Sequence, residues 1–262
     1  MVAESTLSKK VLTRENRLPV TDPSYRYPSS INPYWEKLQS LPAGVICDQE
    51  TEELQGLWRK KFSETYQRHA LTQKKLILEV GCNGGHLLTA LAEREPDALY
   101  LGIDWKFKQI YRAAEKAKKK DLQNTLFLRS RAERVPFTFG EHELDEVKVY
   151  FPDPWEKRAV KKNRFITSSW LQNIWKILKP SGNLHIKTDH REYFTWILEE
   201  IEKSKGPWIW EEKTFHLHKN CVDPEKLEIP DVTLFEKLFI KDGIEINSLK
   251  LRPKYIDTHL KR

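Results

Sequence analysis

The amino-acid sequence predicts an α/β fold: a mostly parallel sheet with helices on both faces and a late antiparallel strand pair. Three observations predict it. Short apolar runs recur from residue 75 onward, and segments with apolar residues at helical spacing separate them. The first, second and fifth of these runs end directly before Gly81, Asp104 and Asp189. Strands that alternate with helices in this way form a parallel sheet with right-handed crossovers.

The strands are predicted from their apolar residues. The first two runs are nearly continuous, as expected for parallel strands that are buried on both faces. In the fourth run Val147, Val149 and Phe151 alternate with polar residues up to Pro152, which cannot continue a central strand. The predicted strands are 76–80, 99–103, 125–130, 147–151 and 184–188, followed by two late strand-like runs at 208–215 and 232–240.

The helices are predicted from apolar residues three and four positions apart, as in Leu87, Leu88 and Leu91. The predicted helices are 85–94, a basic helix at 107–120, 168–178 and 191–203. After the third of these helices, the sequence Lys179-Pro180-Ser181-Gly182 predicts a turn with proline at its second position.

Proline content divides the chain into two parts. Residues 1–45 contain five of the 14 prolines, which predicts an irregular, partly ordered arm. Residues 46–262 are predicted to form the α/β domain that contains the sheet and the candidate site. A flexible tail is the favoured interpretation of the arm. The alternative is an arm that covers a ligand or contacts substrate, for which Tyr25, Tyr27, Tyr34 and Trp35 offer aromatic anchors.

Composition excludes several classes of protein. The 262 residues are 39% hydrophobic, without the run of about 18 apolar residues that a membrane-spanning helix needs. We expect no membrane association and no secretory signal, because Met1–Lys10 lacks an apolar core. The three cysteines form no CxxC pair, so we expect a reducing cytoplasm, no disulfide framework and no metal site. The net charge of +7 alone does not indicate a binding partner, so the positions of the cations along the chain have to be considered.

The loop after the first strand indicates the cofactor. In Glu79-Val80-Gly81-Cys82-Asn83-Gly84-Gly85, the dinucleotide pattern G-x-G-x-x-G fails at Asn83 and His86, and no P-loop Gly-Lys-Ser/Thr follows. S-adenosylmethionine has no phosphates and favours acidic neighbours. Glu79 lies at this strand end, and Asp104 ends the second strand, where a carboxylate can accept both ribose hydroxyls. Asn83 tolerates the positive φ of such a turn.

The motif after the fourth strand indicates the substrate. Phe151-Pro152-Asp153-Pro154-Trp155 fixes one carboxylate between two prolines, beside a flat aromatic ring. The run 157–164 contains five cations and no acidic residue. A fixed carboxylate, an aromatic ring and a cationic strip together suit a nucleotide base on a phosphate chain. A second cationic cluster, of Arg112, Lys116 and Lys118–Lys120, is equally well explained as a solvated helix face.

With these motifs, the chain resembles the tRNA (guanine-N7-)-methyltransferase family from about Lys75 to Lys241, with the Rossmann-like fold of class I methyltransferases. The resemblance implies methyl transfer from S-adenosylmethionine, with S-adenosylhomocysteine as product, to N7 of a guanosine in tRNA. It implies Asp153 as the catalytic residue. The cofactor-binding residues it implies are Glu79, Gly81, Gly85, Asp104, Trp105, Arg131 and Ala132. The implied substrate-binding residues are Lys157, Asp189, Thr233 and Glu236, and the expected RNA contacts are Arg158, Lys161, Lys162 and Arg164.

Some residues depart from the family pattern. Arg131 stands where the family often has Asp or Asn before an alanine, and Asn83 replaces a family glycine. Three alternatives therefore stay open: a methyltransferase acting on another RNA, one acting on a small nucleotide, and a non-catalytic RNA-binding protein that retains the fold. His86 disfavours a nicotinamide dehydrogenase. The sequence leaves open which guanosine is modified and whether the protein acts alone, as a homodimer or with a partner subunit.

Overall fold

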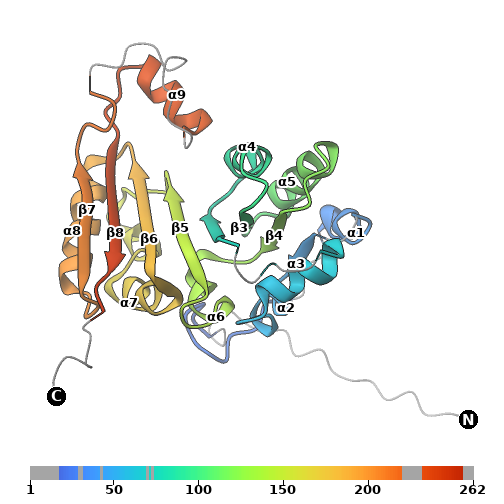
Figure 1. Cartoon of the computed structure of the whole chain (residues 1–262). Helices are drawn as coiled ribbons and strands as arrows, with labels where there is room; N and C mark the ends of the chain where they lie inside the picture. The colour runs from blue at the N-terminus through green and yellow to red at the C-terminus, as the bar shows by residue number, and fades with distance from the viewer. Residues whose placement is uncertain are drawn as a thin grey trace, which may run out of the picture.

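The centre of the molecule is one twisted sheet (Figure 1). The computed structural model describes residues 18–28, 32–41, 44–68, 71, 74–219 and 232–255. Within them the sheet has eight strands in the order β1-β4-β3-β2-β5-β6-β8-β7. The strands are β1 (Val45–Cys47), β2 (Leu76–Val80), β3 (Leu99–Asp104), β4 (Thr125–Arg129), β5 (Leu144–Tyr150), β6 (Leu178–Thr188), β7 (Trp208–Thr214) and β8 (Asn247–Pro253).

Strand pairing places a topological switch point between β2 and β5. The strands β1 to β6 pair in parallel, whereas β8 is antiparallel to both β6 and β7. In the sheet, β3, β4 and β1 follow outward from β2 on one side, and β5, β6, β8 and β7 on the other. In open α/β sheets, ligands bind outside the carboxyl ends of the strands at such a point. The loops after β2 and β5 therefore meet where a ligand site is expected.

Two layers of helices cover the sheet. The helices are α1 (Pro33–Gln39), α2 (Glu50–Glu53), α3 (Trp58–Tyr66), α4 (His86–Arg94), α5 (Phe107–Lys119), α6 (Val135–Thr138), α7 (Ser168–Ile177), α8 (Arg191–Lys203) and α9 (Leu234–Lys241), with short 3-10 helices η2 (Ala132–Arg134) and η3 (Arg158–Asn163). One apolar core lies under α3, α6, α7 and α8, and the other under α1, α4 and α5. The α4 residues predicted to pack, Leu87, Leu88 and Leu91, are buried in these cores. Among the described residues, no helix combines the length and apolarity needed to span a bilayer.

Two predicted elements differ in the structure. The pattern of residues 232–240 predicts a strand, but they form α9, because Thr233 and Glu236 make a reciprocal capping box that starts a helix. The late antiparallel pair exists, but it consists of β7 and β8. The predicted turn at 179–182 is a bulge within β6: pairing with β5 passes from Leu178 directly to Asn183.

The predicted irregular arm contains regular structure. The helix α1 packs on α5 through the rings of Tyr34 and Tyr111, whose centroids are 5.5 Å apart, and through Trp35 on Phe107 at 5.9 Å. Residues 18–28 also contact the domain, as described below. Residues 1–17 of the arm and Cys221 lie outside the described residues.

Candidate active site

A cleft of about 1340 Å³ opens over the carboxyl ends of the strands at the switch point. Its walls come from the loop after β2, the ends of β3 and β4, the loop after β5, the exposed side of α5, and α9. Figure 1 shows α9 beyond the arrowheads of β5 and β6, and Thr233, Leu234, Phe235 and Leu238 at this helix line the cleft. Small-ligand pockets usually measure about 300–1000 Å³. The cleft therefore has room for a cofactor and a second group.

The glycine loop after β2 forms the floor of one half of the cleft. Gly81, Asn83 and Gly85 all have positive φ, at 80°, 49° and 66°. Asparagine therefore takes the turn conformation that the sequence analysis attributed to it. A Cβ placed on Gly81 would meet nothing within 4 Å, so this backbone is open to close approach by a ligand.

Gly85 has a packing role. It does not line the cleft, whereas Gly84 does. A Cβ on Gly85 would lie 2.7 Å from the Cβ of Ala113 on α5. Glycine is needed here so that α4 and α5 can approach each other, and contact between Gly85 and the cofactor stays a prediction.

Asp104 lies at the end of β3, beside the glycine loop. One carboxylate oxygen accepts a hydrogen bond from the Lys106 N–H at 2.8 Å, and the other accepts one from the Asn83 N–H at 3.2 Å. Burial raises the pKa of this carboxyl above its ordinary value, and the Lys106 N–H partly opposes that shift. Glu79, 8% exposed, lines the same half of the cleft. Two acidic side chains thus face a region with open backbone.

The loop after β4 forms another wall of the cleft. Ser130, Arg131 and Ala132 line the cleft, and the Arg131 guanidinium lies 5.7 Å from the centroid of the Trp105 ring. Trp105 is 52% exposed and also lines the cleft. The predicted cofactor-binding residues, except Gly85, therefore share one half of the cleft.

Asp153 lies in the other half, on a loop whose backbone is constrained. Phe151 and Trp155 both have positive φ, at 52° and 46°, which is rare for aromatic residues and concentrates at functional sites. The Phe151 N–H donates to the Lys187 carbonyl at 2.8 Å. Asp153 itself is exposed and lines the cleft. The carboxylate is thus presented to the cleft by a fixed backbone.

Arg164 contacts the buried side of this loop. Its burial differs from the exposed position that the predicted RNA contact requires. Its side chain is 1% exposed, and its Nε donates to the Pro154 carbonyl at 2.8 Å. The guanidinium lies 4.7 Å from the Tyr193 ring centroid and 5.2 Å from that of Trp196. A buried guanidinium cannot meet a phosphate, so Arg164 positions the Asp153 loop instead.

The four predicted substrate-binding residues do not all reach the cleft. Thr233 lines it and caps α9, with its hydroxyl accepting from the Glu236 N–H at 3.0 Å. Glu236 is fully buried, where it pairs with Lys187 at 3.1 Å and His218 at 2.5 Å. It therefore anchors α9 to β6 and does not present a carboxylate to a base. Lys157 is exposed and Asp189 half-buried, and neither lines the cleft.

Cations and exposed apolar side chains surround the opening. Arg158 and Lys162 are exposed on η3. Lys161 is 40% exposed beside Glu192. Across the cleft, Lys106, Arg112, Lys116 and Lys119 line the side formed by α5. Leu234, Phe235 and Leu238 of α9 are each more than half exposed, and all three line the cleft. Leu234 and Phe235 belong to the segment Thr233-Leu234-Phe235-Glu236, whose resemblance to the family implies contact with the site, whereas the sequence analysis missed Leu238. The capping-box spacing of Thr233 and Glu236 is the signal that could have placed Leu238 on a helix beside them.

Comparison with known proteins agrees with this geometry. The sequence profile of a family described as "Putative methyltransferase" matches residues 73–248. A tRNA (guanine-N(7)-)-methyltransferase of Bdellovibrio bacteriovorus is 32% identical over 197 residues, which cover 75% of this chain and 89% of that protein. A bifunctional glycosyltransferase/methyltransferase of Fusobacterium nucleatum is also 32% identical, over 86% of this chain, and the chain spans a third of that protein.

Two solved structures share the fold. An antibiotic-related methyltransferase superposes with a TM-score of 0.52 at 17% identity, covering 76% of this chain and 94% of that one. The 16S rRNA methyltransferase KamB superposes with a TM-score of 0.52 at 15% identity, covering 74% and 94%. At this identity the likeness concerns the fold alone. It confirms the predicted Rossmann-like fold of class I methyltransferases.

Proposed function

Because the chain belongs to the tRNA (guanine-N7-)-methyltransferase family, we propose that it transfers a methyl group from S-adenosylmethionine to N7 of a guanosine in tRNA. The observation that carries this proposal is the shared cleft: the glycine loop with Asp104 and the Asp153 loop form the two halves of one opening. The reaction needs a donor and an acceptor held side by side. A cytoplasmic location belongs to the same proposal, since it follows from the tRNA substrate.

The residues of the first half fit S-adenosylmethionine. The open backbone at Gly81 allows close approach, and Glu79 and Asp104 supply negative charge for a cofactor with a cationic amino group and sulfonium. Asp104 would accept the ribose hydroxyls, and the wall of Ser130, Arg131 and Ala132 would lie along the adenine. When bound, the cofactor supplies an electrophilic methyl group on sulfur. No metal is needed for this transfer, which is part of the proposal.

Asp153 would orient the guanine and stabilise the charge that develops on it. N7 carries an exposed lone pair, and its attack on the methyl carbon releases no proton. The base gains positive charge as the N–C bond forms, so a fixed carboxylate nearby lowers the barrier electrostatically. The same carboxylate can accept hydrogen bonds from the guanine N1–H and amino group, which adenine cannot offer in this pattern. Orientation and charge stabilisation thus replace proton abstraction.

The surroundings of the cleft suit an RNA chain. Cations of α5 line the cleft, Arg158 and Lys162 are exposed on η3, and Trp155 and Phe235 offer exposed rings at the cleft. RNA-binding proteins commonly stack unpaired bases on such rings while cations contact the backbone. We assign Arg158, Lys161 and Lys162 to phosphate contacts, and Lys157 and Asp189 to binding of the substrate nucleotide.

The direct test is incubation with methyl-labelled S-adenosylmethionine and total tRNA, followed by nucleoside analysis. The expected result is label in 7-methylguanosine. Label in another nucleoside would show that the protein is a methyltransferase with a different target. Cofactor binding without any labelled nucleoside, in tRNA or other RNA, would support the non-catalytic alternative.

A further inference from the structure

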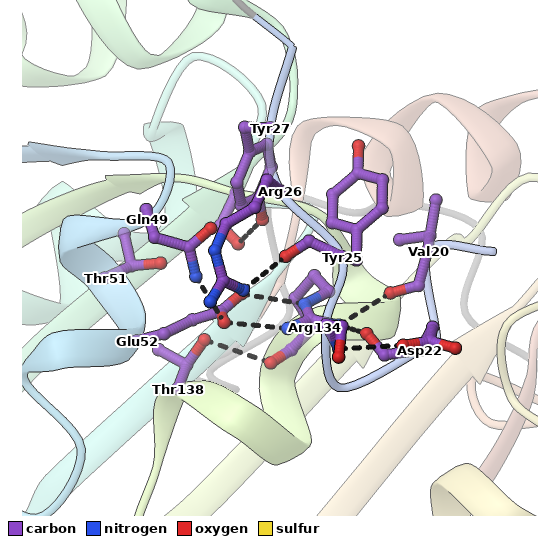
Figure 2. Close-up of polar contacts among 12 residues, drawn as sticks. Val20, Asp22, Tyr25, Arg26, Tyr27, Gln49, Thr51, Glu52, Arg134 and Thr138 are labelled. Atoms are coloured by element: carbon purple, nitrogen blue, oxygen red, sulfur yellow. Dashed lines mark hydrogen bonds and ion pairs between the residues drawn. The ribbon is translucent and has the colours of Figure 1, made fainter. Parts of the chain in front are cut away.

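The N-terminal arm is joined to the wall of the cleft by a buried arginine (Figure 2). Arg134 is fully buried at the end of η2. Its Nη1 donates to the carbonyls of Val20 at 2.8 Å and Asp22 at 2.7 Å. Its Nε and Nη2 donate to the two oxygens of Glu52, each at 2.7 Å. One guanidinium therefore binds the arm, α2 and the loop after β4 together.

Further contacts enclose the Arg134 guanidinium. The guanidinium lies 3.9 Å from the ring centroid of Phe137 and 5.5 Å from that of Tyr25. A buried charge is stable only when it is paired and its donors are satisfied. The backbone of the arm supplies two of the hydrogen-bond acceptors of the Arg134 guanidinium. Residues 18–28 are thus an integral part of the domain and not the flexible tail that the sequence favoured.

Tyr27 connects the arm directly to the cleft lining. Its hydroxyl accepts a hydrogen bond from the Arg131 N–H at 3.3 Å and shares one of 2.5 Å with the Ser130 Oγ. Its ring lies 5.6 Å from the guanidinium of Arg129, which precedes these residues. Burial raises the pKa of Tyr27 above its ordinary value, so the hydroxyl stays protonated. A single side chain therefore holds Ser130 and the backbone of Arg131, which line the cleft.

We propose that the arm is a structural part of the cofactor site, in which Tyr27 and Arg134 position the Ser130–Ala132 wall for S-adenosylmethionine. The Arg131 side chain is directed to Trp105, so the backbone of this wall is left to contact the cofactor. A wall that is fixed before binding costs less ordering free energy when the ligand arrives. The inference rests on the proposed function, because it assigns this half of the cleft to S-adenosylmethionine.

The test compares Tyr27→Phe with Tyr25→Phe. The first removes the hydroxyl that holds the wall, and the second removes a hydroxyl of the same arm that has no hydrogen bond to another described residue. Calorimetric titration with S-adenosylmethionine should give a dissociation constant about fivefold higher for Tyr27→Phe, because the hydroxyl that bonds to Ser130 and to the Arg131 N–H is removed, and an unchanged one for Tyr25→Phe. The affinity of both variants for tRNA should stay as in the wild type.

Amide hydrogen exchange tests the inference independently. If the arm only stabilised the fold, ligand binding would not change the exchange rates of its amides. By linkage, a ligand that prefers the docked arm must stabilise the docked arm in return. S-adenosylhomocysteine should therefore slow amide exchange in residues 20–28 of the wild type, and do so less in Tyr27→Phe. Equal cofactor affinity in the two variants, with no change of exchange in the arm, would overturn the inference. Failure of the wild type to bind the cofactor would instead overturn the proposed function on which it rests.

Discussion

At the scale of single residues, the site depends on how firmly Asp153 is held. Its neighbours Phe151 and Trp155 have backbone conformations that aromatic residues rarely adopt, and Arg164 fixes the loop from the buried side. Such strain persists only where the surrounding structure enforces it. The backbone that carries the carboxylate therefore does not have to be ordered at the moment of reaction, which favours electrostatic stabilisation of a developing charge.

Replacing Asp153 with Asn keeps the shape of the side chain and removes its charge. We expect turnover to fall by about 10²-fold or more, because a preorganised electrostatic interaction is removed. The dissociation constant of S-adenosylmethionine should be unchanged, since Asp153 lies in the other half of the cleft. Steady-state kinetics with tRNA and calorimetry measure the two quantities. Glu156→Gln, an exposed carboxylate of the same loop that does not line the cleft, is the matched control. Full turnover in Asp153→Asn would remove Asp153 from the mechanism.

Residue types and strand ends were sufficient to predict which side chains gather at the cleft, but not which of them are buried. Glu79, Gly81 and Asp104 reach the cleft because residues after parallel strands meet at one edge of the sheet. Arg164 and Glu236 match positions expected to contact substrate, and both are buried. Their burial depends on Tyr193, Lys187 and His218, which are distant in sequence, so no local pattern reveals it.

At the scale of elements, the approach of α4 to α5 depends on Gly85. For Gly85→Ala the new methyl group would lie 2.7 Å from the Ala113 Cβ, at a φ of +66°. We expect a loss of about 2–5 kcal/mol in the free energy of unfolding, from overpacking together with backbone strain. Gly243→Ala is the control: its φ is +68° and its new methyl group would meet nothing within 4 Å, so about 1–2 kcal/mol is expected. Equal losses in urea denaturation would contradict the packing argument.

The position of α9 depends on the buried pair of Glu236 with Lys187. Glu236→Ala removes the partner of a buried ammonium and half of the capping box, so we expect a loss of about 3–5 kcal/mol in stability. Glu245→Ala removes an exposed carboxylate that also faces an arginine and a histidine, and about 0–1 kcal/mol is expected there. Thermal or denaturant unfolding distinguishes the two. A small effect at Glu236 would show that α9 is held by other interactions.

The mistaken prediction of α9 shows what apolar periodicity leaves out. Residues 232–240 contain adjacent apolar residues at 234–235 and 238–240, and such short apolar runs fit a buried strand as well as a helix. In the structure Phe239 packs 5.3 Å from the Phe151 ring, while Phe235 and Leu238 are exposed at the opening of the cleft. By contrast, β2, β3 and α8 have the bounds that their patterns predicted to within a residue.

At the scale of the whole molecule, the proposed substrate extends beyond the cleft, so binding should depend on the cations around it. Replacing Arg158 and Lys162 together with Gln should weaken tRNA binding. It should also reduce the slope of log affinity against log salt by about 0.7–0.9 for each phosphate that the protein no longer neutralises. Lys60→Gln, on α3 with a side chain that is 70% exposed, is the control. Filter binding over a range of salt concentrations measures the slope. An unchanged slope in the double variant would place the RNA elsewhere.

The overall topology follows from the sequence because alternating strands and helices permit few arrangements. The arm could not be predicted in the same way, since its docking depends on carbonyl oxygens that Arg134 binds across more than 110 positions of sequence. Every residue has a backbone carbonyl, so residue type does not indicate which carbonyls accept a distant hydrogen bond. In the site that we propose, a segment whose sequence resembles a flexible tail therefore holds one wall of the cofactor-binding half of the cleft.

The central claim is that donor and acceptor lie in the two halves of one cleft. A crystal structure of the protein with S-adenosylhomocysteine tests this claim directly, because it shows where the ligand and its sulfur atom lie. We expect the ribose hydroxyls to contact Asp104, the adenine to lie along Ser130–Ala132, and the sulfur to face the half of the cleft that contains Asp153. Density for the ligand outside this cleft, or with its sulfur directed away from Asp153, would refute the claim.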